Sequence, residues 1–156
     1  MPASRILLNA IALFCFSLIG LALYLQHMVD MLPCPLCVIQ RYAFLVTGLF
    51  CLLAASTMRV KTWAAAALVG ALAGLATAAK HVHLLANPGL SCGIDPMETM
   101  LNKWPTAVYM PALFQADGLC EDAADLIYGY SIPQWSLLAF GMITLVLVYI
   151  LVRKRH

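Results

Sequence analysis

The chain has 156 residues, of which 63% are hydrophobic and only 10% are charged, with a formal net charge of +2. Soluble domains are about 45–50% apolar and about 25% charged, so the composition excludes a soluble globular enzyme and a disordered chain. The net charge is too small to indicate a nucleic-acid partner. The length fits one domain. Such an apolar chain is expected to lie in the lipid bilayer.

Four stretches are long and apolar enough to cross a bilayer, which takes about 20 residues. In chain order they cover approximately residues 6–25, 38–58, 62–85 and 134–152. The first is long for a signal peptide and no small-residue cleavage site follows it, so we interpret it as a retained span. The sequence therefore predicts an all-α, integral membrane four-helix bundle as a single domain over residues 1–156.

The few charged residues are sorted by side of the membrane. Four spans place both termini on one side and the loops of approximately residues 26–37 and 86–133 on the other. Lys and Arg gather at the termini and between the second and third spans, which the positive-inside rule assigns to the cytoplasm. All seven acidic residues lie in the other two loops. We therefore expect a bacterial inner-membrane protein with cytoplasmic termini and both of these loops facing the periplasm.

The six cysteines divide by this topology. Cys15 and Cys51 lie within the first two spans, where a buried cysteine usually behaves as a small hydrophobic residue. The other four lie in the outward loops, two in each loop. Because the outer side of a bacterial inner membrane is oxidising, they suggest two disulfides. These four are Cys34, Cys37, Cys92 and Cys120.

The motif Cys34-Pro-Leu-Cys37 opens the second span, and such C-x-x-C pairs are typical of redox centres and of zinc half-sites. Pro35 suits a first helical turn, where the helix dipole favours a thiolate on Cys37. Arg41 follows one turn later on the same face. A permanent cation at this depth calls for an anion, such as that thiolate or a reduced cofactor. The alternative is that Arg41 reaches the outer head groups or pairs with Asp30.

Two small residues of the third span, Gly70 and Gly74, form a small-xxx-small pattern. Such a pattern permits close helix packing in lipid. Within a chain of four spans, we expect it to pack against a neighbouring span rather than to form a dimer.

The long outer loop is predicted to contain a short amphipathic helix. Asp95-Pro96 gives a capped start and Pro105 gives a stop. Between them apolar residues recur at helical spacing, so the helix would lie on the outer membrane face. The alternative is an irregular loop with a few apolar anchors. The apolar residues are Met97, Met100, Leu101 and Trp104.

The cysteines of this loop, Cys92 and Cys120, are compatible with two roles. They can form a structural disulfide that closes the loop, or a pair that exchanges electrons with a partner. Their spacing does not decide between the two.

The chain resembles the disulfide bond formation protein B (DsbB) family over nearly its whole length and in the same order. The stretch from Gln26 to Arg41, with its C-x-x-C, resembles the first outer loop and second span of that family. A C-x-x-C alone would be weak, but the second loop and the start of the last span match as well. The matching segments there are Ser91-Cys92, Lys103-Trp104, Gly118-Leu-Cys120-Glu121 and Ile132-Pro133-Gln134-Trp135.

The resemblance implies a thiol:quinone oxidoreductase that reoxidises DsbA, the thioredoxin-like dithiol oxidase of the periplasm. The electrons would pass to ubiquinone or menaquinone. The resemblance places the quinone-proximal pair on Cys34 and Cys37, and the partner-facing pair on Cys92 and Cys120. It places the quinone-interacting arginine on Arg41.

Two further positions follow from the resemblance. Gln26 matches a glutamine of the family motif. The family also has a histidine at the outer end of the third span, for which His81 is our candidate. The chain is slightly shorter than the family pattern between that histidine and Cys92, so His83 is the other candidate. The alternative is that both histidines merely end the span at the interface.

Three other functions are open to the same sequence. The vitamin K epoxide reductase-like family also couples a membrane C-x-x-C to a quinone, but late in its bundle rather than after the first span. A metal-binding or metal-transport protein could use Cys34, Cys37, His81 and His83 as tetrahedral ligands, although Arg41 would then lie beside the metal. A purely structural four-span protein would leave Arg41 and the C-x-x-C without a role.

Overall fold

The computed structural model describes residues 2–87, 94–120, 126–127 and 129–153. It contains four helices that are long and apolar enough to cross a membrane, which confirms the predicted helical membrane bundle. The helices extend beyond the predicted spans at their outer ends, so Gln26 lies within a helix rather than in the first loop. These helices are α1 (Pro2–Met28), α2 (Pro35–Ser56), α3 (Val60–Ala86) and α7 (Ile132–Val152).

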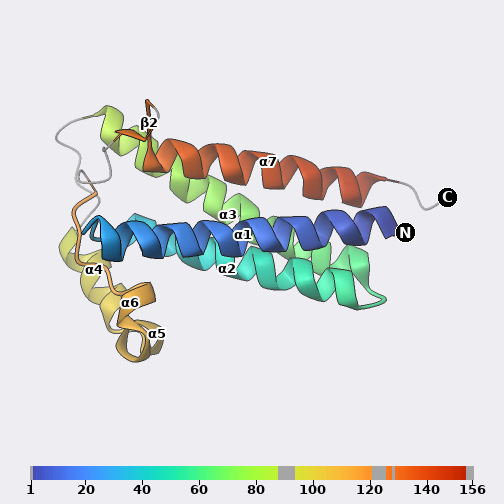
Figure 1. The fold of residues 1–156 in the computed structure, drawn as a ribbon, viewed down its shortest axis with the longest axis horizontal. Helices are drawn as coiled ribbons and strands as arrows, with labels where there is room; N and C mark the ends of the chain where they lie inside the picture. The colour runs from blue at the N-terminus through green and yellow to red at the C-terminus, as the bar shows by residue number, and fades with distance from the viewer. Residues whose placement is uncertain (1, 88–93, 121–125, 128, 154–156) are drawn as a thin grey trace.

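The four long helices run side by side, and the beginning of α1 and the end of α7 lie at the same end of the bundle (Figure 1). Helix α2 packs against α1 and α3, and α3 also packs against α7, whereas α1 and α7 touch only slightly. Cys15 and Cys51 are fully buried members of the apolar core and are free thiols, as expected for small hydrophobic residues.

Helix α3 approaches its neighbours closely through its glycines. A Cβ atom on Gly70 would lie 2.8 Å from Oγ1 of Thr47 in α2, and a Cβ on Gly74 would collide with the ring of Phe140 in α7. The Phe140 ring in turn stacks on Phe44 of α2, with ring centroids 3.9 Å apart. The small-residue pattern therefore packs within the chain, as predicted.

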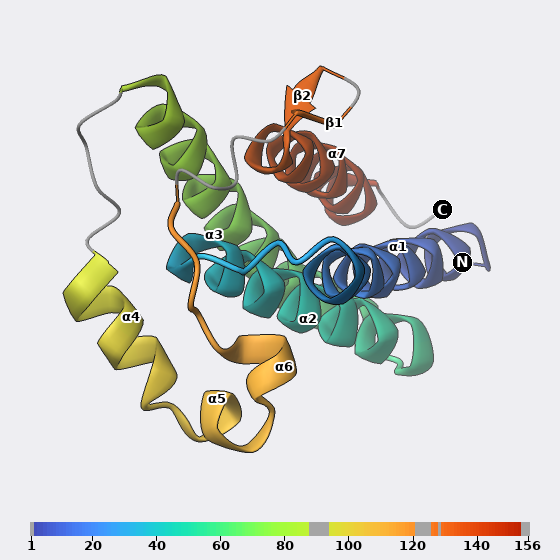
Figure 2. The same ribbon diagram turned by 60° about the vertical axis from the view of Figure 1, so that its left-hand side comes forward.

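Over residues 94–114 the long loop forms three short helices, at the end of the bundle away from the beginning of α1 (Figure 2). They are α4 (Ile94–Asn102), α5 (Pro105–Tyr109) and α6 (Pro111–Phe114). Asp95 and Pro96 therefore lie in the first turn of α4 rather than before it. Helix α4 ends at Asn102, before the predicted stop at Pro105, so Trp104 lies outside it. Pro105 instead begins α5, which the sequence pattern did not indicate.

The apolar side of α4 packs against α2 rather than being exposed throughout. Leu101 is 2% exposed and lies in a small cluster with Val38 of α2 and Phe114 of α6. The Phe114 ring stacks on Tyr42 of α2, with centroids 4.3 Å apart. In contrast, Met100 is 55% exposed, so only part of the predicted apolar face covers the bundle.

A two-stranded hairpin leads into α7. Strand β1 (Leu126–Ile127) pairs in antiparallel register with β2 (Tyr130–Ser131). Gly129 in the turn has φ +85°, a conformation that favours glycine. The backbone N–H of Ser131 donates to Oε1 of Gln134 at 2.8 Å, which secures the start of α7.

Candidate functional site

The C-x-x-C motif forms the start of α2, as the sequence predicts. Cys34 is the N-cap residue, Pro35 occupies the first turn, and the backbone N–H of Cys37 donates to Sγ of Cys34 at 3.2 Å. Both thiols are free. Cys34 is fully buried and Cys37 is half-buried. The first turn of a long helix presents unpaired N–H groups and the positive end of its dipole, so this position stabilises an anionic sulfur.

The two sulfurs of the motif have different surroundings. Burial raises the pKa of the Cys34 thiol above its ordinary value, because the thiolate would lose its hydration. Cys34 is therefore held as a neutral thiol, or in a disulfide, at neutral pH. Cys37 is the more accessible of the two sulfurs.

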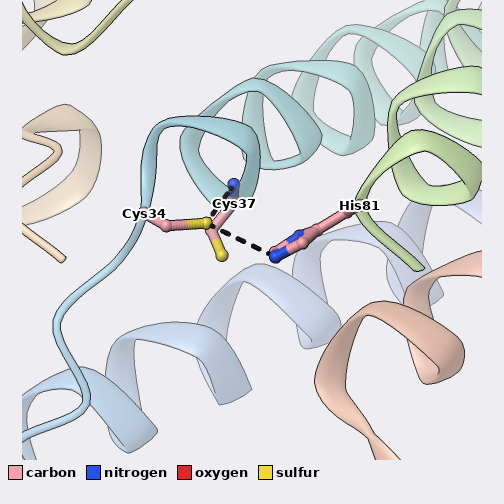
Figure 3. A group of neighbouring side chains, drawn as sticks. All are labelled: Cys34, Cys37 and His81. Carbon is pink, nitrogen blue, oxygen red and sulfur yellow. Dashed lines mark hydrogen bonds between the residues drawn. The ribbon is translucent and has the colours of Figure 1, made fainter. Parts of the chain in front are cut away.

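His81 joins the C-x-x-C motif to the second loop. Its side chain is fully buried, and Nε2 lies 3.9 Å from Sγ of Cys34 and 3.2 Å from the carbonyl oxygen of Cys120. Figure 3 shows the imidazole of α3 directed at the two sulfurs of α2. His83 is exposed and contacts Asn87 instead. Of the two candidate histidines, the structure thus brings His81 to the cysteines.

Gln40 is the other polar neighbour of His81, and sequence reasoning missed it. It is 5% exposed, and its amide nitrogen lies 3.4 Å from Nδ1 of His81. The signal that could have found it is a polar side chain one turn after Cys37, next to Arg41, in a span that is mostly apolar. Both imidazole nitrogens therefore have defined partners.

Cys120 lies in the same buried cluster as Cys34 and Leu36. It is 4% exposed and is bonded in a disulfide. The other loop cysteine, Cys92, and the neighbouring Glu121 lie outside the described residues. One cysteine of each outer loop is thereby brought to the same place.

Direct backbone contacts hold the two loops together. The N–H groups of Asp117 and Gly118 donate to the carbonyl oxygen of Pro33 at 3.2 and 3.1 Å. A Cβ on Gly118 would collide with the backbone carbonyl of Leu32. Glycine is therefore required where the second loop crosses the first, two residues before Cys120.

Arg41 turns toward α1 and the second loop. It is 7% exposed and donates to Oε1 of Gln26 at 2.8 Å, to the carbonyl oxygen of Leu113 at 3.0 Å and to that of Ala22 at 3.5 Å. Within the described part of the chain, it forms no ion pair with Asp30, which is exposed. Neither sequence alternative for Arg41, a head-group contact or a pair with Asp30, therefore describes its side chain.

Gln26 thus has a defined contact: its side chain orients the guanidinium of Arg41 from the last turn of α1. The carbonyl of Leu113 was not foreseeable, because it depends on how α6 docks. Arg41 makes no hydrogen bond to Cys37. Its charge acts on this end of the bundle through space, and its three acceptors within the described residues are neutral.

Three of the four residues proposed as metal ligands come together. The ligand atoms of Cys34, Cys37 and His81 all lie within 4.8 Å of one another. His83 does not belong to this group. The four-ligand zinc site considered from the sequence is therefore wrong in its fourth ligand.

Comparisons with known proteins agree with the predicted resemblance. Residues 4–150 match the family described as disulfide bond formation protein DsbB. Proteins named disulfide bond formation protein B include one from Herminiimonas arsenicoxydans, which is 50% identical over 99% of this chain and 99% of its own length. One from Ralstonia nicotianae is 44% identical over 98% of this chain and 97% of its own. One from Cupriavidus necator is 45% identical over 97% of this chain and 94% of its own length.

Proposed function

The chain belongs to the DsbB family of disulfide bond formation proteins, and on that premise we propose that it is a membrane thiol:quinone oxidoreductase. It reoxidises a periplasmic DsbA-like dithiol oxidase and passes the electrons to a membrane quinone, ubiquinone or menaquinone. The observation that carries the proposal is the meeting of Cys34 and Cys120 in one buried cluster beside His81. A disulfide of the second loop can there exchange with the C-x-x-C.

The first exchange occurs in the second loop. A thiolate of the reduced partner attacks Cys92, breaks a Cys92–Cys120 bond and leaves Cys120 as a thiolate. Cys120 then attacks Cys34, so that the Cys34–Cys37 bond breaks and Cys37 leaves as a thiolate. Cys37 is the better leaving group, because it lies in the first helical turn where an anion is stabilised.

The second half of the cycle releases the partner. Its second thiolate attacks the mixed disulfide, and the partner leaves oxidised while Cys92 becomes a thiolate. Cys92 attacks Cys120, which restores the loop disulfide and leaves Cys34 and Cys37 as a dithiol. This step is supported by the free thiols of Cys34 and Cys37 and by the disulfide of Cys120. His81 lies where its Nε2–H can donate to Cys34 as that sulfur gains charge.

A quinone, when bound, accepts two electrons and two protons as the Cys34–Cys37 disulfide re-forms. Two features of the site fit such an acceptor. Cys37 is the more accessible sulfur, and Arg41 is a buried cation that, in the described part of the chain, donates to neutral oxygens. Arg41 can therefore stabilise an oxygen atom that becomes negatively charged.

The energetics explain the need for a strong final acceptor. DsbA has a potential of about −120 mV and a thioredoxin-like pair about −270 mV, so oxidation of DsbA by an ordinary C-x-x-C is uphill by about 7 kcal/mol. The DsbA–DsbB–quinone relay is the known case in which a quinone keeps the periplasm oxidising. Removal of electrons from Cys34 and Cys37 would draw the exchange forward in the same way here.

The decisive experiment measures quinone reduction by the purified chain in detergent, with a reduced DsbA-like protein as electron donor. We expect Cys37→Ala to abolish turnover, because the C-x-x-C disulfide can no longer form. Cys51→Ala is the matched control, since it removes a buried cysteine of the same helix remote from the motif. Turnover by Cys37→Ala at the rate of the Cys51→Ala control would exclude the proposed reaction.

A further inference from the structure

We propose that the reduced Cys34–Cys37 pair and His81 form a zinc-binding site, and that Zn²⁺ bound there inhibits the redox cycle. The inhibitory consequence rests on the function proposed above, whereas the binding itself does not. The three residues come from two helices, the start of α2 and the outer part of α3 (Figure 3).

The positions of the ligand atoms fit a compact metal site. They lie within 4.8 Å of one another, and Nε2 of His81 is already 3.9 Å from Sγ of Cys34. In tetrahedral zinc, bonds of about 2.3 Å to sulfur and about 2.0–2.1 Å to nitrogen place ligands about 3.4–3.8 Å apart. Small rotations of the thiol side chains meet this requirement. The carbonyl oxygen of Cys120, 3.2 Å from Nε2, or a water molecule completes the tetrahedron.

Gln40 supplies the outer partner that metal-binding histidines usually have. Such a histidine donates its second ring N–H to a carbonyl or carboxylate oxygen, which fixes its orientation. The amide of Gln40 lies on Nδ1 of His81, at 3.4 Å. Rotation of that amide by half a turn presents Oε1 as an acceptor for an Nδ1–H. The same glutamine can thus support His81 with or without zinc.

Charge and oxidation state decide when the ion binds. Binding of Zn²⁺ releases two protons from the dithiol and gives a formally neutral zinc dithiolate, so no uncompensated charge is added to the buried site. The disulfide form offers no thiolate and cannot bind in this way. Cys37 is half-buried and gives access to the site. Because zinc then occupies both sulfurs, it blocks formation of the Cys34–Cys37 disulfide and the delivery of electrons.

The binding test uses the full chain in detergent, with Co²⁺ as a spectroscopic probe for the zinc site. We expect the reduced protein to bind one Co²⁺ with the absorption of a tetrahedral thiolate site, displaced by Zn²⁺, and the oxidised protein to bind none. His81→Ala should weaken binding strongly. His83→Ala is the matched control, because the exposed His83 is outside the group, and it should bind as the wild type does.

Gln40 provides variants with opposite expectations. Gln40→Leu removes the outer partner and should weaken Zn²⁺ binding about 10–100-fold. Gln40→Glu keeps an acceptor on Nδ1 and should bind at least as tightly as the wild type. This pair also protects the test against a fold defect in either single variant. Equal Zn²⁺ affinities of Gln40→Leu and Gln40→Glu would contradict the site. An equal loss of metal affinity in His81→Ala and His83→Ala would also contradict it.

The functional test follows quinone reduction by the wild type while Zn²⁺ is added. We expect inhibition that a chelator reverses, and inhibition of His83→Ala at the same zinc concentration as the wild type. Bound zinc without inhibition would overturn the proposal. If the chain binds Co²⁺ as expected but reduces no quinone, the proposed function fails and the site stands. If it reduces quinone but binds no metal, only the zinc site fails.

Discussion

At the scale of single residues, Arg41 has the most unusual environment. It is a permanent cation in a membrane-spanning helix, is 7% exposed, and among the described residues its hydrogen-bond acceptors are neutral oxygens. These neutral oxygens satisfy N–H groups of the guanidinium but do not neutralise its charge, and a buried charge is costly away from water. In the proposed reaction, an electron acceptor whose oxygen becomes negative would be stabilised next to this charge.

Arg41→Ala should lower quinone reduction about 10–100-fold, since a charge-assisted hydrogen bond contributes about 1.5–3 kcal/mol. The rate of quinone reduction by Arg41→Lys should lie between those of the wild type and Arg41→Ala, because an ammonium keeps the charge but not the planar fork of donors. Formation of the mixed disulfide between the partner and Cys92 should be unaffected in both. Steady-state kinetics with varied quinone measures the first effect, and trapping with acid and an alkylating agent measures the second.

Lys103→Ala is the control for loss of a positive charge, because Lys103 is exposed in the long loop. Its quinone kinetics should match those of the wild type. If Arg41→Ala also matches the wild type, the guanidinium has no part in electron transfer.

The residue-scale predictions from sequence succeeded where the residue type and its position on a helix were sufficient. Pro35 next to the cysteines predicted the start of α2, and the structure places it there. The choice between His81 and His83 depended on which side of α3 faces α2. The small apolar residues of α3 are spread over all its sides, so its sequence does not reveal that side. Gln40 and the carbonyl of Leu113 became partners only through tertiary packing.

At the scale of elements, helix α3 packs closely against two neighbouring helices at positions where it has glycine. Gly70 leaves room for Thr47, and Gly74 leaves room for the Phe140 ring, which is fully buried. In lipid, helix association depends on such close packing rather than on a hydrophobic driving force. The position of His81 relative to α2 therefore depends on contacts deeper in the same helix.

Gly74→Ala should destabilise the bundle by about 1–3 kcal/mol, the usual cost of overpacking, because its Cβ would collide with Phe140. Gly141→Ala is the matched control, since a Cβ at Gly141 meets nothing within 4 Å. Equilibrium unfolding in mixed detergent micelles compares the two. An unfolding midpoint for Gly74→Ala equal to that of the control would show that the α3–α7 contact is looser than described.

The elements that sequence patterns predicted are those with enough residues to show a period. The four spans and α4 met that condition. Helices α5 and α6 have 5 and 4 residues, and each strand has 2, which is too short for a periodic signal. They are set by packing, as in the stacking of Phe114 of α6 on Tyr42 of α2.

At the scale of the whole molecule, the two outer loops behave as one assembly on the end of the bundle. The carbonyl of Pro33 accepts hydrogen bonds from Asp117 and Gly118. The backbone N–H of Ala116 donates to Oδ1 of Asn102 at 2.8 Å, and Nδ2 of Asn102 donates to the carbonyl oxygen of Ala116 at 2.9 Å. The segment 116–118, which leads to Cys120, is therefore held both by Asn102 of α4 and by Pro33 of the first loop.

Gly118→Ala should separate the two halves of the proposed reaction. Its Cβ would collide with the carbonyl of Leu32 and displace the segment before Cys120. A displacement of about 1 Å can cost about 100-fold in rate, so we expect quinone reduction to fall about 10–100-fold while the partner still forms a mixed disulfide. Single-turnover trapping of both species measures this, with Gly20→Ala, which has open space, as control.

Orientation in the membrane gives a second whole-molecule prediction. Tyr109 in the long loop is 84% exposed, and Met58 between α2 and α3 is 86% exposed at the other end of the bundle. A membrane-impermeant maleimide should label Tyr109→Cys in cells with a permeabilised outer membrane. It should label Met58→Cys only after lysis. The reverse pattern would invert the proposed topology.

The placement of both ends of the chain also has a practical consequence. Helix α1 begins and helix α7 ends at the side of the bundle away from the start of α2, where Cys34 and Cys37 lie (Figure 1). Helix α7 has 21 residues, so its length of about 30 Å separates its C-terminal end from the sulfur centres. A fluorescent reporter or affinity tag fused at either end would not obstruct them. Immobilised by its C-terminal end on an electrode, the protein would present its disulfide chemistry outward.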